Sequence, residues 1–344
     1  MKKLYLTAIF LMTSLMSFAQ ESLVTNLQID ARLDYMQEYQ EGGKIQDNSG
    51  FRGKFLNIRM DGRLTDNISY SYRQRLNKPN KDVSFFDATD WITLTYTPGN
   101  WSFSGGKQVV AIGGYEYDRA PIDIYFSSEY WHHIACYQIG VSAAYTLNSG
   151  NDTFKFQFCE SPFRKNALNA DNDEMFAYNL MWTSSHGVFN SIYSVNMIEY
   201  LPGRFINYIA AGNRFELGKF DIELDLMNRA SSLKNFLGKD FSVMAEFVWK
   251  ATDRLNIFAK YTYDTNKADE PGDLCVAYGT DVTRFGAGLE YFPLKDSKNI
   301  RLHLNGCYTL GTCPETTSLK PKQTIIDAGL TWRMNMLNLK RKNQ

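Results

Sequence analysis

The stretch Phe55–Leu64, FLNIRMDGRL, decides the fold because its apolar and polar residues alternate along the chain. Successive side chains of a β-strand point to opposite faces, so Leu56 and Ile58 share one face while Arg59 and Asp61 share the other. Such a strand separates an apolar environment from a polar one. The wall of a water-filled membrane barrel has this property, with lipid on one side and water on the other.

The same two-residue period recurs along the whole chain, for example over residues 27–35, 154–159 and 326–334. Counting such segments predicts about sixteen strands, and an even number suits a closed bacterial barrel. Tight turns such as 65–67 alternate with polar connections of roughly ten to thirty residues. We therefore predict an all-β fold, a transmembrane antiparallel β-barrel. Its strands are expected near residues 30, 58, 72, 94, 104, 142, 156, 180, 193, 212, 224, 245, 260, 288, 304 and 330.

Aromatic residues give a second test of the barrel, because rings that face lipid gather at the membrane interfaces. The aromatic residues at lipid-facing positions fall at the predicted tight-turn ends of their strands. They are Tyr96, Trp101, Tyr145, Trp182, Trp249, Tyr291 and Trp332. The alternative, a soluble β-sandwich, would not need all these rings at one height.

The N-terminus predicts export. Lys2 and Lys3 precede an apolar run over residues 4–15, and Ser17-Phe18-Ala19 follows as a small-residue cleavage site. This is the pattern of a secretory signal peptide, expected over residues 1–19, and the run is too short to span a bilayer as a helix. Residues 20–344 are then expected to form one barrel domain in the outer membrane of a Gram-negative bacterium.

Composition gives no sign of nucleic-acid binding, catalysis or a metal site. Without Lys2 and Lys3 the chain has 35 basic and 37 acidic residues, a net charge of −2, so a nucleic-acid partner is not expected. The five cysteines show no CxxC spacing, and we expect no catalytic residues, cofactor or metal. On a strand, His132 and His133 would point to opposite faces, and residues 169–174 lack the glycine of a calcium loop. A disulfide between Cys275 and Cys313, in neighbouring outer loops, is one hypothesis.

The longest connection runs from about residue 109 to 136 and is the third of the long loops. Its sequence over 113–126, GGYEYDRAPIDIYF, is too apolar and aromatic for a freely solvated loop. We expect it to fold into the lumen and pack against the inner wall. The alternative is a loop that caps the outside of the barrel. Inside, four charged residues would narrow the pore and set a local field; they are Glu116, Asp118, Arg119 and Asp123.

With these features in place, the strand end Gly105-Gly106-Lys107-Gln108, which runs into this loop, resembles the phosphate-selective porin O and P family. The resemblance spans most of the chain but is carried by loose patterning. It implies a sixteen-stranded, trimeric, passive anion channel with basic residues along the path. The matching candidates on the lumen side are Arg59, Arg63, Arg73 and Arg75, joined by Lys107 near the loop.

The sequence departs from such a path because the same face carries many carboxylates, including Asp30, Asp34, Asp61, Glu223 and Glu246. These can pair with the arginines, so phosphate selectivity does not follow. The expected partners are small polar or anionic solutes, outer-membrane lipids and two further copies of the chain. The alternative function is a non-conducting barrel that serves as a structural or surface-interaction platform. That function would call for large outer loops or an appended domain.

Overall fold

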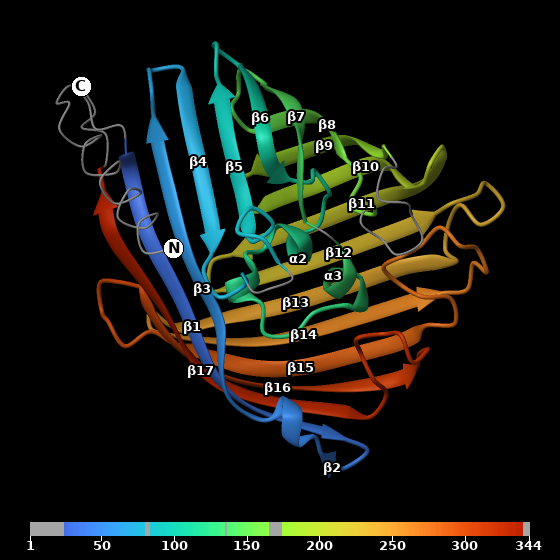
Figure 1. Cartoon of the computed structure of the whole chain (residues 1–344). Coiled ribbons are helices and arrows are strands. Elements are labelled where there is room, and N and C mark those ends of the chain that lie inside the picture. Colours follow the sequence, from blue (N-terminus) through green and yellow to red (C-terminus); the bar gives the residue numbers. More distant parts are fainter. Residues whose placement is uncertain (1–23, 80–82, 135, 165–173, 340–344) are drawn as a thin grey trace.

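The computed structural model describes residues 24–79, 83–134, 136–164 and 174–339, and these form a closed antiparallel β-barrel (Figure 1). They contain seventeen strands, of which β2 has only two residues, so sixteen long strands build the wall. Each predicted strand centre falls within one of them, and the predicted fold class is confirmed. The long strands are β1 (Val24–Gln40), β3 (Gly50–Arg63), β4 (Ile68–Arg75), β5 (Thr89–Tyr96), β6 (Trp101–Val109), β7 (Tyr137–Thr146), β8 (Asp152–Glu160), β9 (Phe176–His186), β10 (Phe189–Leu201), β11 (Arg204–Leu217), β12 (Phe220–Ala230), β13 (Asp240–Thr252), β14 (Leu255–Asn266), β15 (Asp281–Tyr291), β16 (Ile300–Thr312) and β17 (Gln323–Asn338).

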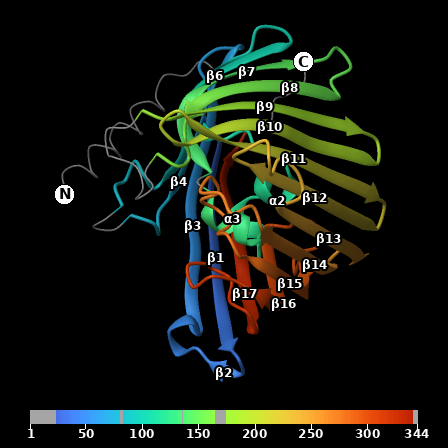
Figure 2. The same ribbon diagram turned by 90° about the vertical axis from the view of Figure 1, so that its right-hand side faces the viewer.

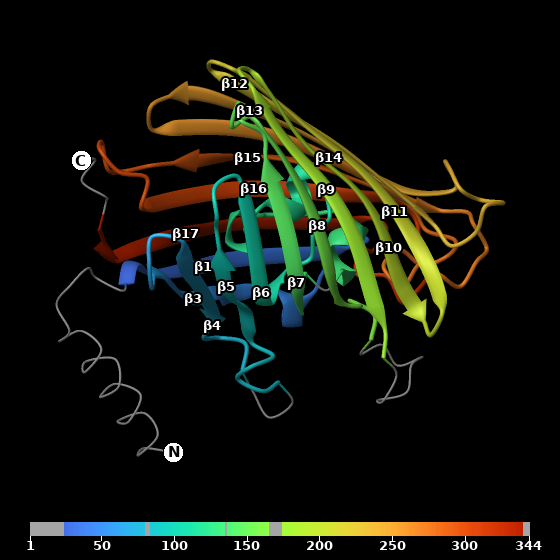
Figure 3. The same ribbon diagram turned by 90° about the horizontal axis from the view of Figure 1, so that it is seen from above.

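The barrel closes between its first and last long strands. Each long strand pairs antiparallel with the next along the chain, and β1 pairs with both β3 and β17. The β1–β17 register runs from Asn26 opposite Asn338 to Gln40 opposite Gln323. Figure 3 shows these strands, in blue and red, side by side. Closure leaves no unpaired edge along this seam, so the backbone polar groups of β1 and β17 are satisfied on both sides.

The wall is two-faced, as the alternation predicts. On β9 and β10, Leu180 and Val195 lie opposite each other and are 54% and 52% exposed, whereas Asn179 and Asn196 are fully buried. Asn196 donates to the carboxamide oxygen of Asn179 at 2.8 Å. Apolar side chains therefore face outward, and the polar face is turned inward, where its groups bond to one another.

Several aromatic residues at the tight-turn ends of the strands contact neighbouring rings. The rings of Trp101 and Tyr145, on β6 and β7, have centroids 4.9 Å apart. Trp182 on β9 lies 5.9 Å from Phe154 and 5.6 Å from Tyr193, its neighbours on both sides. Such edge-to-face and stacked contacts are favourable and link the rings of neighbouring strands.

The connections differ in two places from the expected rhythm of short turns and long loops. β10 and β11 are joined at the long-loop end by only Pro202 and Gly203. At the other end, residues 292–299 form a longer connection between β15 and β16. In addition, β2 (Gly43–Lys44) and the 3₁₀ turn η1 (Gln46–Asn48) extend the β1–β3 hairpin past the ends of the other strands (Figure 2).

The connection between β6 and β7 contains short helical turns. They are α2 (Tyr115–Asp118), η2 (Pro121–Asp123) and α3 (Glu129–His133). Ser128 caps α3, because its hydroxyl accepts a hydrogen bond from the Trp131 amide. Figures 1 and 2 show α2 and α3 among the strands, and they contact the buried face of the wall. His132 and His133 lie at the end of α3, within this connection.

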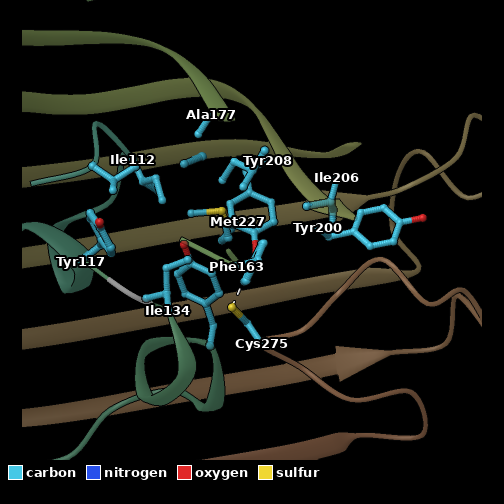
Figure 4. Packing of buried hydrophobic residues seen from close by; sticks show 14 of the residues in the cluster. Ile112, Tyr117, Ile134, Phe163, Ala177, Tyr200, Ile206, Tyr208, Met227 and Cys275 are labelled. Atoms are coloured by element: carbon cyan, nitrogen blue, oxygen red, sulfur yellow. Dashed lines mark hydrogen bonds between the residues drawn. The ribbon is translucent and has the colours of Figure 1, made fainter. Parts of the chain in front are cut away.

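A hydrophobic core lies on the buried face of β9–β12 (Figure 4). The inward-facing positions of these strands, which are polar elsewhere in the barrel, are occupied here by Ile198, Tyr208 and Met227. Tyr130 and Ile134 of the β6–β7 connection pack on them. Tyr130 and Tyr208 make an edge contact with ring centroids 5.7 Å apart. Outer-loop residues complete the core, which the two-residue period does not predict. They are Phe163, Met175, Cys275 and Val276.

The five cysteines are all free thiols, so the proposed Cys275–Cys313 disulfide is wrong. Cys275 instead accepts a hydrogen bond from the Tyr208 hydroxyl at 3.6 Å inside the core, and Cys313 donates to the Leu319 carbonyl at 3.1 Å. Among the described residues, no helix is long and apolar enough to cross a membrane. The expected signal peptide, residues 1–19, and most of the acidic stretch 169–174 lie outside the described residues.

Candidate functional site

Arg119 fixes the β6–β7 connection to the wall, and from here residues 110–134 are called the inner segment. One of its terminal nitrogens, Nη1, lies 2.7 Å from each carboxylate oxygen of Glu246 on β13, and Nη2 lies 2.5 Å from Glu223 on β12. Both carboxylates are buried. Charge-assisted contacts of this kind are strong and directional, so Arg119 acts as an anchor, not as a free charge.

Asp123 forms a second anchor on the opposite side. Its Oδ1 lies 2.8 Å from Nη2 of Arg301 on β16 and 2.6 Å from Nη2 of Arg333 on β17. Burial acts to raise the pKa of Asp123, but the two guanidinium groups outweigh it and hold the pKa below its ordinary value. Arg32 on β1 adds hydrogen bonds to the carbonyls of Ile122 and Ile124, at 3.2 and 2.7 Å.

Glu116 is also occupied by anchoring contacts. It accepts hydrogen bonds from the amide and hydroxyl of Ser128, and Nζ of Lys260 on β14 lies 2.7 Å away. Burial acts to raise the pKa of Glu116, yet the ammonium and these hydrogen bonds together lower it. Three of the four charges predicted to shape a pore, Glu116, Arg119 and Asp123, therefore hold the inner segment in place.

The inner segment encloses a cavity of about 350 Å³ against β1, β3, β4 and β5. Four arginines and three aspartates line it, together with aromatic side chains. The charged residues are Arg59, Arg73, Arg119, Arg333, Asp30, Asp118 and Asp123, and the aromatic ones are Trp91, Tyr117, Trp131 and Tyr137. The formal charge of this lining is +1, because four positive groups face three negative ones.

Trp91 organises the basic side of the cavity. Its indole nitrogen donates to the Ser71 hydroxyl at 2.7 Å, which fixes the ring on the inward face of β5. The guanidinium carbons of Arg73 and Arg59 lie 5.0 and 5.8 Å from its ring centroid, within cation–π range. Trp91 is not among the site residues predicted from the sequence. The alternation along the strand does indicate its orientation: Trp91 is an odd number of residues from Ile92 and Tyr96, which point outward, so its side chain points inward.

The four arginines predicted to line a pore have different surroundings. Arg59 is 46% exposed and pairs with Asp61 of its own strand at 2.9 Å. Arg73 and Arg75 share Asp90, at 3.3 and 2.9 Å, and Arg73 is nearly buried. Arg63 is exposed, and no ion pair forms on it within the described residues. Only Arg59 and Arg73 of the four reach the cavity.

Lys107 is a correction to the sequence prediction. It lies in register with Ile92 of β5 and Ile139 of β7, which are exposed on the apolar face. Its ammonium donates to the carbonyls of Phe86 and Asp87, at 3.1 and 3.3 Å, beneath the β4–β5 connection. Strict alternation from Trp101 along β6 places position 107 on this outer face, so its charge does not join the basic lining.

With this geometry established, a comparison with known families decides the assignment. The model of the phosphate-selective porin O and P family matches residues 23–194, half of the 344-residue chain. The chain belongs to this family. Together with the closed sixteen-stranded wall, membership makes it an outer-membrane porin through which solutes diffuse passively.

Solved structures share the fold of this porin at low sequence identity. The anion-selective porin from Comamonas acidovorans has a TM-score of 0.64 and 12% identity, covering 91% of this chain and 100% of that one. The outer membrane channel DcaP of Acinetobacter baumannii has a TM-score of 0.62 and 13% identity, with 90% and 96% covered. OmpT of Vibrio cholerae, in its trimer form, has a TM-score of 0.60 and 13% identity, with 90% and 99% covered. No curated protein sequence matches the porin.

Proposed function

We propose that this porin lies in the outer membrane of a Gram-negative bacterium and passes small polar solutes with a weak preference for anions. The inner segment narrows the lumen, and solutes pass through the cavity between it and β1, β3, β4 and β5. The observation that carries the proposal is the +1 lining of this cavity, in which Arg59 and Arg73 present their guanidinium groups. The chain acts as a passive channel and not as an enzyme.

The packing of the interior supports a route on this side of the barrel. The hydrophobic core fills the space between the inner segment and β9–β12 with side chains such as Tyr130, Ile198 and Tyr208. A hydrated ion entering that core would lose its water without compensation. The wall of β3, β4 and β5 instead offers Arg59, Ser71 and Trp91, which can exchange hydrogen bonds or ring contacts with a passing solute.

Anion preference is expected to be weak and not phosphate-specific, because most basic groups are already paired. Asp61 lies against Arg59, and Asp90 lies against both Arg73 and Arg75. A carboxylate at hydrogen-bond distance cancels most of the field of a guanidinium at longer range. The remaining excess attracts anions in general without a site that selects one.

We further propose that the porin assembles as a homotrimer through β4, β5 and β6. These strands have eight, eight and nine residues, whereas β14 has twelve. At a rise of about 3.3 Å and a tilt of about 40°, eight residues span about 20 Å, less than the apolar band of about 25 Å. A short wall is better covered by neighbouring subunits than by lipid. The V. cholerae OmpT structure is described as a trimer.

A recording of the refolded porin in a planar bilayer tests the anion preference. Under a tenfold KCl gradient, we expect steady conductance and a reversal potential on the anion side. Replacing the exposed cavity arginine, Arg59→Gln, should move the reversal potential toward zero, since it removes one positive charge from the lining. Lys250→Gln is the matched control, because Lys250 pairs with Asp221 outside the cavity.

Each outcome has a defined meaning. Anion preference that falls in Arg59→Gln but not in Lys250→Gln supports the route through the cavity. Steady conductance without anion preference would overturn the proposed selectivity while leaving the channel. A folded barrel with no conductance at all would overturn the cavity as a solute path and favour a non-conducting platform.

A further inference from the structure

Three buried side chains from three adjacent strands converge at the seam where the barrel closes. Asp34 lies on β1, Asp327 on β17 and His303 on β16, and they are 2%, 2% and 3% exposed. Nε2 of His303 is 3.5 Å from Oδ1 of Asp34 and 3.7 Å from Oδ1 of Asp327. These ligand atoms lie within 4.8 Å of one another. One imidazole and two carboxylates are ordinary ligands of a divalent metal ion.

The cluster is not satisfied by the protein alone. Both ring nitrogens of His303 and Oδ1 of Asp327 have no hydrogen-bond partner, although all are buried. Oδ2 of Asp34 lies 2.8 Å from Nη2 of Arg32, in an ion pair. A buried polar atom without a partner costs free energy, so such atoms are few in native proteins. Here Nε2 of His303 lies 3.5 Å from Oδ1 of Asp34 and 3.7 Å from Oδ1 of Asp327. That arrangement calls for an occupant that bonds to all three side chains.

We propose that Asp34, His303 and Asp327 bind a divalent transition-metal ion of the Zn²⁺ class. Tetrahedral ligands at about 2.0–2.1 Å from zinc lie about 3.3 Å apart, close to the observed separations of 3.5 and 3.7 Å. An imidazole ligand favours such an ion over Mg²⁺ and Ca²⁺, which prefer six or more oxygens. Three protein ligands leave one position for water.

A proton on His303 is the competing occupant. It would make the imidazole a donor to the two carboxylates, but normal N–H···O hydrogen bonds measure 2.7–3.2 Å. The observed Nε2 to oxygen distances of 3.5 and 3.7 Å are longer than that range. They leave a gap between the nitrogen and the oxygens that suits a metal ion better than a shared proton.

Neighbouring charges permit a cation in the cluster. The Nε of Arg32 lies 3.0 Å from Oδ1 of Asp34, and its Nη2 lies 3.2 Å from Oδ2 of Asp327. Arg32 and the two carboxylates sum to −1 with a neutral imidazole, and Lys54 on β3, which interacts electrostatically with both carboxylates, brings the sum to zero before an ion binds. Arg32 holds Oδ2 of Asp327, and Oδ1 of that carboxylate stays available to the metal.

The backbone makes room for the cluster at Gly329 of β17. Gly329 is in register with both Asp34 on β1 and His303 on β16. A Cβ at this position would overlap Oδ1 of Asp34 and Cε1 of His303. The absent side chain lets the carboxylate and the ring approach each other across the intervening strand.

A metal here would join the first strand to the last two. It would also fasten the inner segment, because the Tyr125 ring lies 4.6 Å from the His303 ring and the Arg32 guanidinium lies over Tyr125 at 4.9 Å. The ion would therefore stabilise barrel closure and the seating of the inner segment. This inference does not depend on which solutes the porin passes.

The test uses the full-length porin refolded in detergent with excess ZnCl₂ or with chelator, because a buried site fills most readily during folding. After gel filtration, we expect about one zinc ion per chain and a thermal unfolding temperature roughly 5 °C above that of the chelated sample. Refolding with Co²⁺ should give visible d–d absorption bands that Zn²⁺ abolishes. His303→Gln should lose both signals.

Two matched controls exclude adventitious binding at other histidines. His186→Gln removes an exposed histidine beside Asp152 at the end of β9, and His133→Gln removes the partner of Glu129; both should keep the bound ion. The proposal is overturned if zinc content and the cobalt bands are unchanged in His303→Gln. It is equally overturned if the wild-type porin, refolded with zinc, holds none and shows no cobalt bands. Because the second result needs only wild-type protein, a variant that fails to fold does not block the test.

Discussion

Asp118 differs from the other acidic residues of the inner segment in its ionisation. The pKa values of Glu116, Asp123 and Glu129 are lowered by neighbouring cations or hydrogen bonds despite burial. Asp118 faces the cavity without an ion pair in the described structure, and desolvation raises its pKa despite the opposing effect of Arg214. It is therefore the carboxylate of this segment that a moderate fall in pH neutralises first.

We predict that anion preference increases as the pH falls from neutral toward the raised pKa of Asp118. A raised pKa means that protonation begins above the ordinary midpoint of 3.8, and each proton removes one negative charge from the cavity. The reversal potential under a KCl gradient, measured at pH 7 and pH 5, reports the change. Asp118→Asn should show the larger anion preference already at pH 7 and little further change at pH 5. A wild-type reversal potential that moves toward cations on acidification would contradict this assignment.

The inner segment is held by charge pairs, so its position depends on a few side chains. Arg119 is the strongest single anchor, because it joins Glu223 and Glu246 on two strands. Removing one partner of a buried ion pair costs about 3 kcal/mol, since the other partner stays buried without compensation. For Arg119 the cost falls mainly on Glu246, because Glu223 also pairs with Arg214 at 2.6 Å.

We predict that Arg119→Gln loosens the inner segment and gives larger, noisier single-channel currents. Glu246, whose other cation Lys260 lies 3.9 Å away, then favours conformations in which water reaches it, and these require the segment to leave the wall. Single-channel conductance and its variance measure the effect. Lys250→Gln, which breaks the Lys250–Asp221 pair within the wall, should keep the wild-type noise. Equal noise in both variants and the wild type would argue that Arg119 is not the anchor.

The strands could be predicted from the sequence because their signal is local. Every second side chain is apolar from Leu56 to Met60 in β3 and from Ile326 to Met334 in β17, and lipid on one face and water on the other enforce this period without help from distant residues. The core against β10–β12 has no such signal. Ile198, Tyr208 and Met227 break the alternation because loop residues from elsewhere in the chain cover them.

The candidate site was predictable in its composition but not in its pairing. Parity places Arg59 and Arg73 on the inner face, and both reach the cavity. It does not reveal that Arg119 and Asp123 bond to strands 100 or more residues away, since such contacts depend on how the inner segment packs against the wall. The cluster of Asp34, His303 and Asp327 could not be predicted from the sequence for the same reason, because 269 residues separate Asp34 from His303.

The outer surface of the barrel is apolar on all sides, but the strands differ in length, so the wall is shorter at β4, β5 and β6 than at β14. Leu94 on β5 and Leu289 on β15 each lie two residues from a tight-turn aromatic residue, Tyr96 and Tyr291. Both side chains are exposed on the outer face, so they occupy matching depths. They differ in surroundings, because β5 belongs to the short wall and β15 to the taller one.

If the short wall is the subunit interface, Leu94→Arg should convert trimers into folded monomers, whereas Leu289→Arg should leave trimers intact. An arginine placed between subunits is buried without a partner, while one at the lipid face near an interface costs about 1 kcal/mol or less and can reach water. Light scattering after gel filtration, or unheated gel electrophoresis, separates the two states. A monomeric wild-type porin would refute the trimer. Dissociation by Leu289→Arg but not by Leu94→Arg would place the interface on the taller wall, because the charge disrupts assembly only where a neighbouring subunit covers it.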